Sequence, residues 1–222
     1  MMIQGAVFDA DGTLLDSTQM WANVGELFLS RLGIQAAPGL SAILFPMSLP
    51  DATDYLIHTY GLTLSQQEVT DRVNTMVGEF YSAQVRLKPG VRSFLRELQA
   101  RGVPMTVATA TDRVAIEKGL SRTGIEDYFQ EIFTCTEVGI GKEAPDVYLA
   151  AAERMGTAPD VTWVFEDALH GAETAKAAGF RVAAVYDPVS ARHQEALRQI
   201  ADVYLLDLRG ADQFFQTICR LN

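Results

Sequence analysis

The 222-residue sequence is poor in the residues that form disulfides and clustered metal ligands. It has two cysteines, Cys135 and Cys219, which do not form a CxxC pair. Isolated cysteines of this kind are commonly thiols at or near a core. None of the three histidines, His58, His170 and His193, lies in a liganding pattern. The sequence therefore predicts neither a disulfide framework nor a histidine-based site.

The sequence also shows no pattern typical of a membrane span or of a leader, and it has no surplus of positive charge. No apolar run approaches the length of a bilayer-spanning helix, and MMIQGAVFDADG has neither a basic region nor a long apolar stretch. The net charge is −10, whereas nucleic acids and anionic membranes attract basic surfaces. We expect a cytoplasmic protein that binds neither of them. An anionic substrate remains open, because a metal ion can reverse the local charge.

What the sequence does contain is an alternation of short apolar runs and helical patterns. The apolar runs predict parallel strands, and the 3.6-residue patterns between them predict crossover helices. The sequence therefore predicts an α/β fold, a Rossmann-like parallel sheet sandwiched by helices. The expected strands are 3–9, 104–110, 131–135, 162–167, 180–186 and 201–207, and the expected helices are 91–102, 113–122, 145–156, 168–179 and 211–219.

One region, residues 16–87, breaks this alternation because it has no strand pattern. Apolar residues recur at helical spacing in two stripes, and Ser65 with Glu68 forms a capping box before the second. The pattern predicts an inserted α-helical cap at 16–87 and a catalytic core formed by 1–15 and 88–222. The stripes are Val24, Leu27, Phe28 and Leu32, and Val69, Val73, Met76, Val77 and Phe80.

Polar residues gather where the expected strands end. In open parallel sheets, ligands bind outside the carboxyl ends of the strands, so these side chains should meet at one edge. The order and placement of these polar residues favour a single site. The residues are Asp9 and Asp11 after the first strand, Thr109 at the end of the second, Lys142 in the loop after the third, and Glu166 and Asp167 at the end of the fourth.

Each of these residues also has a structural alternative. Asp11 and Gly12 could form a plain turn, and Thr109 could cap a turn with its hydroxyl. Lys142 could be a solvated loop lysine, and Asp167 could be the N-cap of the following helix.

As a set, the residue types suit phosphoryl transfer. A carboxylate can attack phosphorus and form an aspartyl-phosphate, and Mg²⁺ held by hard oxygen ligands offsets the repulsion between the two anions. A lysine and a hydroxyl can bind the transferring phosphoryl oxygens. A second carboxylate two residues on points to the same side of an extended chain, where it can protonate the leaving oxygen and later activate water.

These motifs resemble those of the haloacid dehalogenase superfamily of phosphohydrolases. The segments DADGT, the Thr-ended second strand, GKEAPDVYLAAA and FEDALHGAETAKAAG appear in the family's order over nearly the whole chain. The chain is most similar to the helical-cap subgroup that includes β-phosphoglucomutase and phosphoglycolate phosphatase-like enzymes. The resemblance implies a Rossmann-like core with a mobile cap that closes over the substrate.

The resemblance also implies roles for the acidic residues. Asp9 would be the nucleophile and Asp11 the general acid/base, which also offers its backbone carbonyl to Mg²⁺. Glu166 and Asp167 would complete the metal site with Asp9 and Asp11. Asp16, where the chain leaves the core, has no assigned catalytic role.

The phosphate-binding residues implied by the resemblance are Thr109, Ala110, Lys142 and Gly12. Two departures from the family pattern occur here. Ala110 stands where Ser or Asn often follows the motif Thr, so the role would pass to the backbone or to the next residue. Glu143 replaces the first proline of the common GKPAPD loop and places a negative charge beside Lys142.

Within the family, Asp11 favours phosphoryl transfer to water, because the dehalogenases lack this second aspartate. Residues 16–87 contain no lysine, which argues against the Schiff-base chemistry of phosphonatase-like members. A β-phosphoglucomutase-like mutase is the weaker alternative. Trp21 stands where those enzymes carry a cap histidine, and three arginines against seven acids make a sugar bisphosphate costly to bind in the cap.

We therefore expect Mg²⁺-dependent hydrolysis of a small phosphorylated metabolite by a protein that is a monomer by default. The alternatives are the mutase and a catalytically silent binding protein on the same fold, although the presence of Asp9, Asp11, Lys142 and Asp167 disfavours the latter. The leaving group would meet an apolar cap surface formed by Trp21, Met20, Phe45 and Met47. Packing within the cap is the alternative role for these four side chains.

Overall fold

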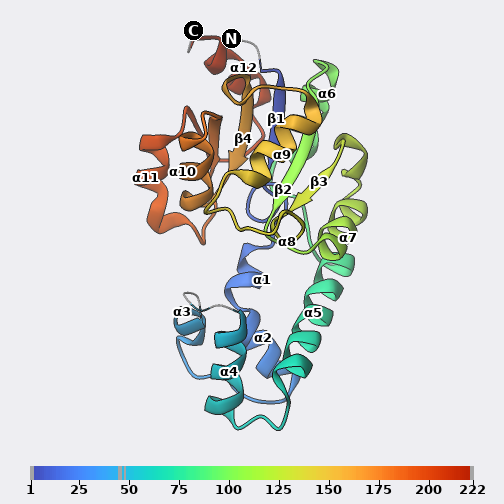
Figure 1. The fold of residues 1–222 in the computed structure, drawn as a ribbon, viewed down its shortest axis with the longest axis vertical. Coiled ribbons are helices and arrows are strands. Elements are labelled where there is room, and N and C mark those ends of the chain that lie inside the picture. The colour runs from blue at the N-terminus through green and yellow to red at the C-terminus, as the bar shows by residue number, and fades with distance from the viewer. Residues whose placement is uncertain (1–2, 45–46, 48, 221–222) are drawn as a thin grey trace.

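The computed structural model describes residues 3–44, 47 and 49–220, which form an α/β core and a helical cap (Figure 1). Phe45 lies outside the described residues. The strands of the core point toward the cap, so their carboxyl ends face it (Figure 1). The fold class expected from the sequence is confirmed.

The core contains one six-stranded parallel sheet in the order β3-β2-β1-β4-β5-β6. This order places β1 at the sheet centre, between β2 and β4, where the direction of winding reverses. Ligands bind at such switch points. The strands are β1 (Gly5–Phe8), β2 (Met105–Thr109), β3 (Ile132–Thr134), β4 (Thr162–Glu166), β5 (Arg181–Val185) and β6 (Val203–Leu205).

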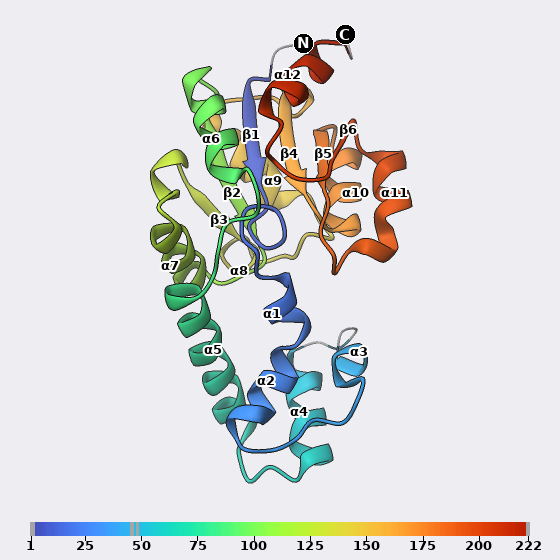
Figure 2. The same cartoon turned by 180° about the vertical axis from the view of Figure 1, so that it is seen from behind.

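Helices cover both faces of the sheet. α6, α7 and α12 pack on one face and α9, α10 and α11 on the other (Figure 2). The core helices are α6 (Val91–Ala100), α7 (Arg113–Thr123), α8 (Cys135–Val138), α9 (Asp146–Met155), α10 (Leu169–Ala177), α11 (Gln194–Ile200) and α12 (Ala211–Arg220), with 3-10 turns at Glu126–Tyr128, Pro159–Val161 and Ala191–His193.

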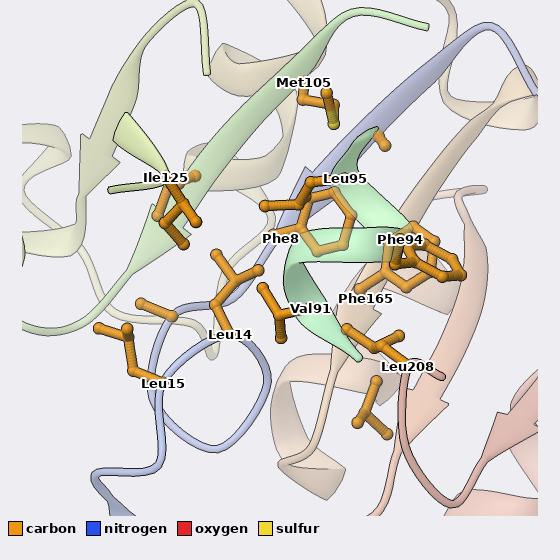
Figure 3. Close-up of a cluster of buried hydrophobic side chains, with 14 of the residues drawn as sticks. Phe8, Leu14, Leu15, Val91, Phe94, Leu95, Met105, Ile125, Phe165 and Leu208 are labelled. Atoms are coloured by element: carbon orange, nitrogen blue, oxygen red, sulfur yellow. The ribbon is translucent and has the colours of Figure 1, made fainter. Parts of the chain in front are cut away.

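The central strand is buried on both faces, as its apolar run predicts. Val7 belongs to the cluster under α9 and α10, whereas Phe8 belongs to the cluster under α6 and α12. Phe8 stacks on Phe165 with ring centroids 4.4 Å apart, and Phe94 meets Phe165 edge-on at 5.3 Å (Figure 3). This aromatic packing fixes β1 against β4, directly behind the carboxylates that follow both strands.

The cap consists of helices with an apolar cluster of their own. Phe28 and Leu29 of α2 pack with Val69 and Met76 of α5. The capping box at Ser65 is confirmed, because Ser65 Oγ accepts from the Glu68 amide at 3.3 Å and the Glu68 carboxylate accepts from the Ser65 amide at 2.8 Å. The cap helices are α1 (Thr18–Ala22), α2 (Val24–Arg31), α3 (Leu40–Leu44), α4 (Leu49–Tyr60) and α5 (Gln66–Ala83).

The chain leaves and re-enters the core at neighbouring points. The Asp16 amide donates to the Arg86 carbonyl at 2.9 Å, and Leu15 forms an antiparallel bridge with Leu87. The two cap linkers therefore run side by side at the carboxyl end of β1.

The sequence did not predict two core helices, α8 and α11. Cys135 is a buried thiol at the start of α8, whereas Cys219 is exposed on α12 and does not lie in the core. Among the helices built from described residues, none is both long and apolar enough to cross a membrane.

Candidate active site

Three buried carboxylates meet at the carboxyl ends of β1 and β4. Asp9 directly follows β1, Glu166 ends β4 and Asp167 follows it. One oxygen from each lies within 4.8 Å of the other two. The strand pairing explains the meeting, because Phe8 is in register with Phe165 and so places the residues that follow them side by side.

Lys142 contacts two of these carboxylates. It lies in the loop between α8 and α9, and only 5% of the residue is exposed. Its Nζ donates to Asp9 Oδ1, and to Glu166 Oε2 at 2.9 Å. A solvated loop lysine, the alternative considered from the sequence, does not fit this burial.

The charges in this cluster are unbalanced, with three carboxylates around one ammonium group. Burial and then the charge of Glu166 raise the pKa of Asp9 above its ordinary value, against the opposing effect of Lys142. Burial, Glu166 and Asp187 raise the pKa of Asp167 to about 8. Burial alone would lower the pKa of Lys142, but the charges of Asp9 and Glu166 outweigh it and raise that pKa. The cluster therefore favours an additional cation.

The donor set fits Mg²⁺. Carboxylate oxygens are hard ligands, and this ion is bound in proteins by such oxygens together with those of water and substrate. Lys142 donates to Asp9 and Glu166, whereas Asp167 Oδ2 accepts from Ser190 Oγ at 3.0 Å. Its side chain does not cap the next helix, because the N-cap of α10 is Ala168.

Asp11 is held by three hydroxyl groups. Oδ1 accepts from Tyr81 Oη of α5 and from Ser17 Oγ at 2.5 Å, and Oδ2 accepts from Thr111 Oγ1 at 2.7 Å. Trp21 Nε1 in turn donates to Tyr81 Oη at 2.9 Å. The Asp11 carboxyl therefore contacts both the cap and the core, and it is not merely part of a solvated turn.

The end of β2 lies beside this group. Thr109 is fully buried, and its Oγ1 accepts from the Thr111 amide at 3.1 Å, the turn-capping bond considered from the sequence. Ala110 is exposed, and Thr111, the other candidate for the missing Ser or Asn, directs its hydroxyl to Asp11. The positive φ of Gly12 (+94°) turns the chain directly after Asp11.

A cavity of about 450 Å³ lies between the cap and the core, next to the partners of Asp11. Its wall includes Trp21 and Val77 from the cap and Thr111 and Lys118 from the core. Met20, another predicted lining residue, is buried in the main hydrophobic cluster, which favours packing as its role. Met47 is half-buried, and its contact with a substrate stays a prediction.

The sequence did not identify several polar residues of this region. Ser17, Tyr81 and Ser190 contact Asp11 or Asp167, although they lie far from the motifs or outside them. Only Tyr81 had a signal in the sequence, because it lies four residues after Val77 and so extends the buried stripe of α5. The two serines gave no pattern before the fold brought them to the carboxylates.

Comparison with known proteins places this chain in a family. The sequence profile described as haloacid dehalogenase-like hydrolase matches residues 6–185. The chain is 29% identical over 213 residues to (DL)-glycerol-3-phosphatase 2 of Arabidopsis thaliana, covering 89% of this chain and 86% of the other. It is 26% identical over 211 residues to hexitol phosphatase B of Escherichia coli (strain K12), covering 93% of each.

Solved structures confirm the architecture. The crystal structure of CbbY from Rhodobacter sphaeroides in complex with phosphate aligns with a TM-score of 0.73 and 22% identity, covering 94% of this chain and 96% of that one. At this level of identity the likeness establishes the fold.

Proposed function

Because the chain belongs to the haloacid dehalogenase-like hydrolase family and is a phosphatase, we propose that it hydrolyses a small phosphorylated metabolite through an aspartyl-phosphate on Asp9, with Mg²⁺. The observation that carries the proposal is the buried Asp9 carboxylate, which shares Lys142 with Glu166 at the central switch point of the sheet. This arrangement brings together a nucleophile, a cation that can bind phosphoryl oxygens, and a pair of carboxylates that can bind a metal ion.

In the first step, an Asp9 oxygen attacks phosphorus and the bond from phosphorus to the leaving oxygen breaks. Lys142 and the Thr109 hydroxyl hold the phosphoryl oxygens while this charge moves. Asp11 gives its proton to the leaving oxygen, which departs as an alcohol. A bound Mg²⁺ would be held by Asp9, Glu166 and Asp167, and it would supply the positive charge that lets an anionic nucleophile approach a phosphate.

In the second step, Asp11 is a carboxylate and accepts a proton from water. This water attacks the phosphorus, the bond to the Asp9 oxygen breaks, and inorganic phosphate forms. Asp11 regains its proton and Asp9 its free carboxylate, so the two residues are ready for another turnover.

The cavity beside Asp11 supports a leaving group of metabolite size. The leaving oxygen has to lie within hydrogen-bond reach of the Asp11 carboxyl. Asp11 itself is not part of the cavity wall, but Thr111 is, and its hydroxyl donates to Asp11 at 2.7 Å. Small-molecule sites of about 300–1,000 Å³ are typical of proteins, and this one lies within that range.

The replacement Asp9→Asn tests the nucleophile. We expect it to lower turnover by at least about 10³-fold, because an amide cannot form the acyl phosphate, while the fold is kept. The measurement is phosphate release with Mg²⁺ over a panel of monophosphates that includes aryl phosphates, with circular dichroism to follow the fold.

The matched control is Asp16→Asn, which changes an exposed aspartate of the same segment and should keep full activity. Turnover retained in Asp9→Asn would refute the nucleophile assignment. A wild-type protein inactive on the whole panel would refute the proposed hydrolysis.

A further inference from the structure

A second buried ion pair lies next to the candidate site, at Asp187 in the loop after β5. Asp187 is 1% exposed and Lys88 is 8% exposed. Lys88 Nζ donates to Asp187 Oδ2 at 2.6 Å and to the Tyr186 carbonyl at 3.0 Å. None of the chemical steps above uses this pair.

The Asp187 carboxylate contacts both segments that join the cap to the core. Thr18, the first residue of α1, donates from Oγ1 to Asp187 Oδ1 at 2.8 Å. Lys88 belongs to the returning segment, and its amide donates to the Leu14 carbonyl at 2.9 Å. One side chain of the core therefore holds the outgoing linker through one oxygen and the returning linker through the other.

The loop that carries Asp187 also reaches the metal-competent carboxylates. The Val189 amide donates to Asp187 Oδ1 at 2.9 Å, which folds the loop back on itself. The next residue, Ser190, donates from Oγ to Asp167 Oδ2 at 3.0 Å. Four residues of one loop thus connect the cap linkers to Asp167.

A requirement for stability alone does not account for a charged pair at this position. Moving two charges out of water is costly, and apolar side chains of similar volume often stabilise a fold as well or better. The hydrogen bonds to Thr18, Val189 and Lys88 fix how the loop and the two cap linkers lie relative to one another, which apolar packing would not do. The geometry therefore favours a positioning role for Asp187.

We propose that Asp187 is a positioning residue that fixes Asp167 and the two cap linkers relative to one another. It would act on the metal through Ser190 and on the substrate through Thr18. This inference rests on the proposed function, because the two properties that Asp187 would affect are Mg²⁺ binding and substrate binding under the cap.

Three variants of the full-length protein separate the two effects. Ser190→Ala should weaken Mg²⁺ binding about fivefold, the effect of about one lost hydrogen bond, and leave the KM for a phosphate monoester unchanged. Thr18→Val should raise that KM about fivefold and leave Mg²⁺ binding unchanged. Asp187→Asn should do both. The Mg²⁺ affinity is measured by isothermal titration calorimetry without substrate, and KM by phosphate release.

The matched control is Asp202→Asn. Asp202 also pairs with a lysine, Lys176, but it lies before β6 at the opposite end of the strands. This variant should change neither Mg²⁺ affinity nor KM. If Asp187→Asn lowers the melting temperature and leaves both quantities at wild-type values, Asp187 is purely structural and the proposal is wrong.

The two hydroxyl variants keep the proposal testable if Asp187→Asn does not fold, because each removes a single hydroxyl. Wild-type Mg²⁺ affinity in Ser190→Ala together with wild-type KM in Thr18→Val would refute the proposal. A wild-type protein that binds Mg²⁺ but hydrolyses no monophosphate would refute the proposed function. The calorimetric comparison of Ser190→Ala and Asp187→Asn would still decide the metal half of the inference.

Discussion

At the scale of single residues, Gly12 shows how closely the backbone after Asp11 approaches the side chains of Asp167 and Thr18. A Cβ atom on Gly12 would lie 2.6 Å from the carboxylate of Asp167 and 2.8 Å from Thr18 Cγ2. The φ of +94° is also one that side chains rarely adopt. Both the space and the backbone conformation therefore require glycine after Asp11.

We predict that Gly12→Ala disrupts the site more than the fold. The methyl group should displace Asp167, so activity should fall by at least about tenfold, because displacements of about 1 Å have large catalytic effects. Stability should fall by about 1–3 kcal/mol from the strained backbone. Phosphate release and urea denaturation measure the two effects.

Gly33→Ala is the control, because Gly33 has φ +74° and no atom within 4 Å of its Cβ position. It should lose stability by a similar mechanism and keep full activity. Equal activity losses in the two variants would contradict the argument from the Asp167 contact.

The site residues that could be predicted from the sequence are those whose chemistry and strand-end placement coincide. Asp9, Lys142, Glu166 and Asp167 were expected together, and the structure brings them together. Their individual roles remain proposals. The role proposed for Asp187 could not be predicted, because it depends on hydrogen bonds to residues that are distant in the sequence and that only the fold brings near.

At the scale of elements, α6 links the sheet to the C-terminal helix through Phe94. This side chain is 1% exposed and contacts Phe8, Phe165 and Phe214, with centroid distances of 6.4, 5.3 and 5.3 Å. β1, β4, α6 and α12 therefore share one aromatic cluster, of which Figure 3 labels Phe8, Phe94 and Phe165.

Phe94→Ala should lower the free energy of unfolding by about 3–5 kcal/mol, because it removes buried apolar area and leaves a cavity among rigid neighbours. Urea denaturation followed by circular dichroism measures the change. Leu149→Ala, at a leucine that is 42% exposed on α9, should change stability by less than about 1 kcal/mol. Similar losses for the two variants would show that Phe94 is not a central contact of these elements.

The predictability of the elements follows their burial. The six strands and the helices α6, α7, α9, α10 and α12 have apolar patterns, so their existence could be read from the sequence. The short helix α8 is four residues long, and α11 buries only Leu197, so neither leaves a clear periodicity. Tertiary contacts rather than local pattern determine these two.

At the scale of the whole molecule, the candidate metal site joins segments far apart in the chain. Asp9 follows the first strand, whereas Glu166 ends the fourth and Asp167 follows it, and the cap is inserted between the two strands. A cation bound by all three carboxylates would relieve their repulsion in the folded state only. Binding to the folded state alone stabilises a protein by mass action.

Mg²⁺ should therefore raise the melting temperature, and a chelator should reverse the effect. At about 100 times the dissociation constant the gain is about 2.7 kcal/mol, which corresponds to about 5–10 °C for a chain of this size. Differential scanning fluorimetry with and without EDTA measures it. Asp167→Asn should lose most of the shift. An equal Mg²⁺ shift in that variant would place the binding site elsewhere.

The adjacency of the two cap linkers has a consequence for how this chain can diversify. The Asp16 amide donates to the Arg86 carbonyl at 2.9 Å, so the two ends of the cap lie as close together on the core as the two ends of a short hairpin loop. The entropic cost of closing a loop rises only with the logarithm of its length. Insertions of very different size could therefore replace one another at this junction while the sheet stays unchanged. Selectivity for the leaving group can then change when one cap is replaced by another, provided that the new cap still places a hydrogen-bond donor at Asp11, as Tyr81 does here.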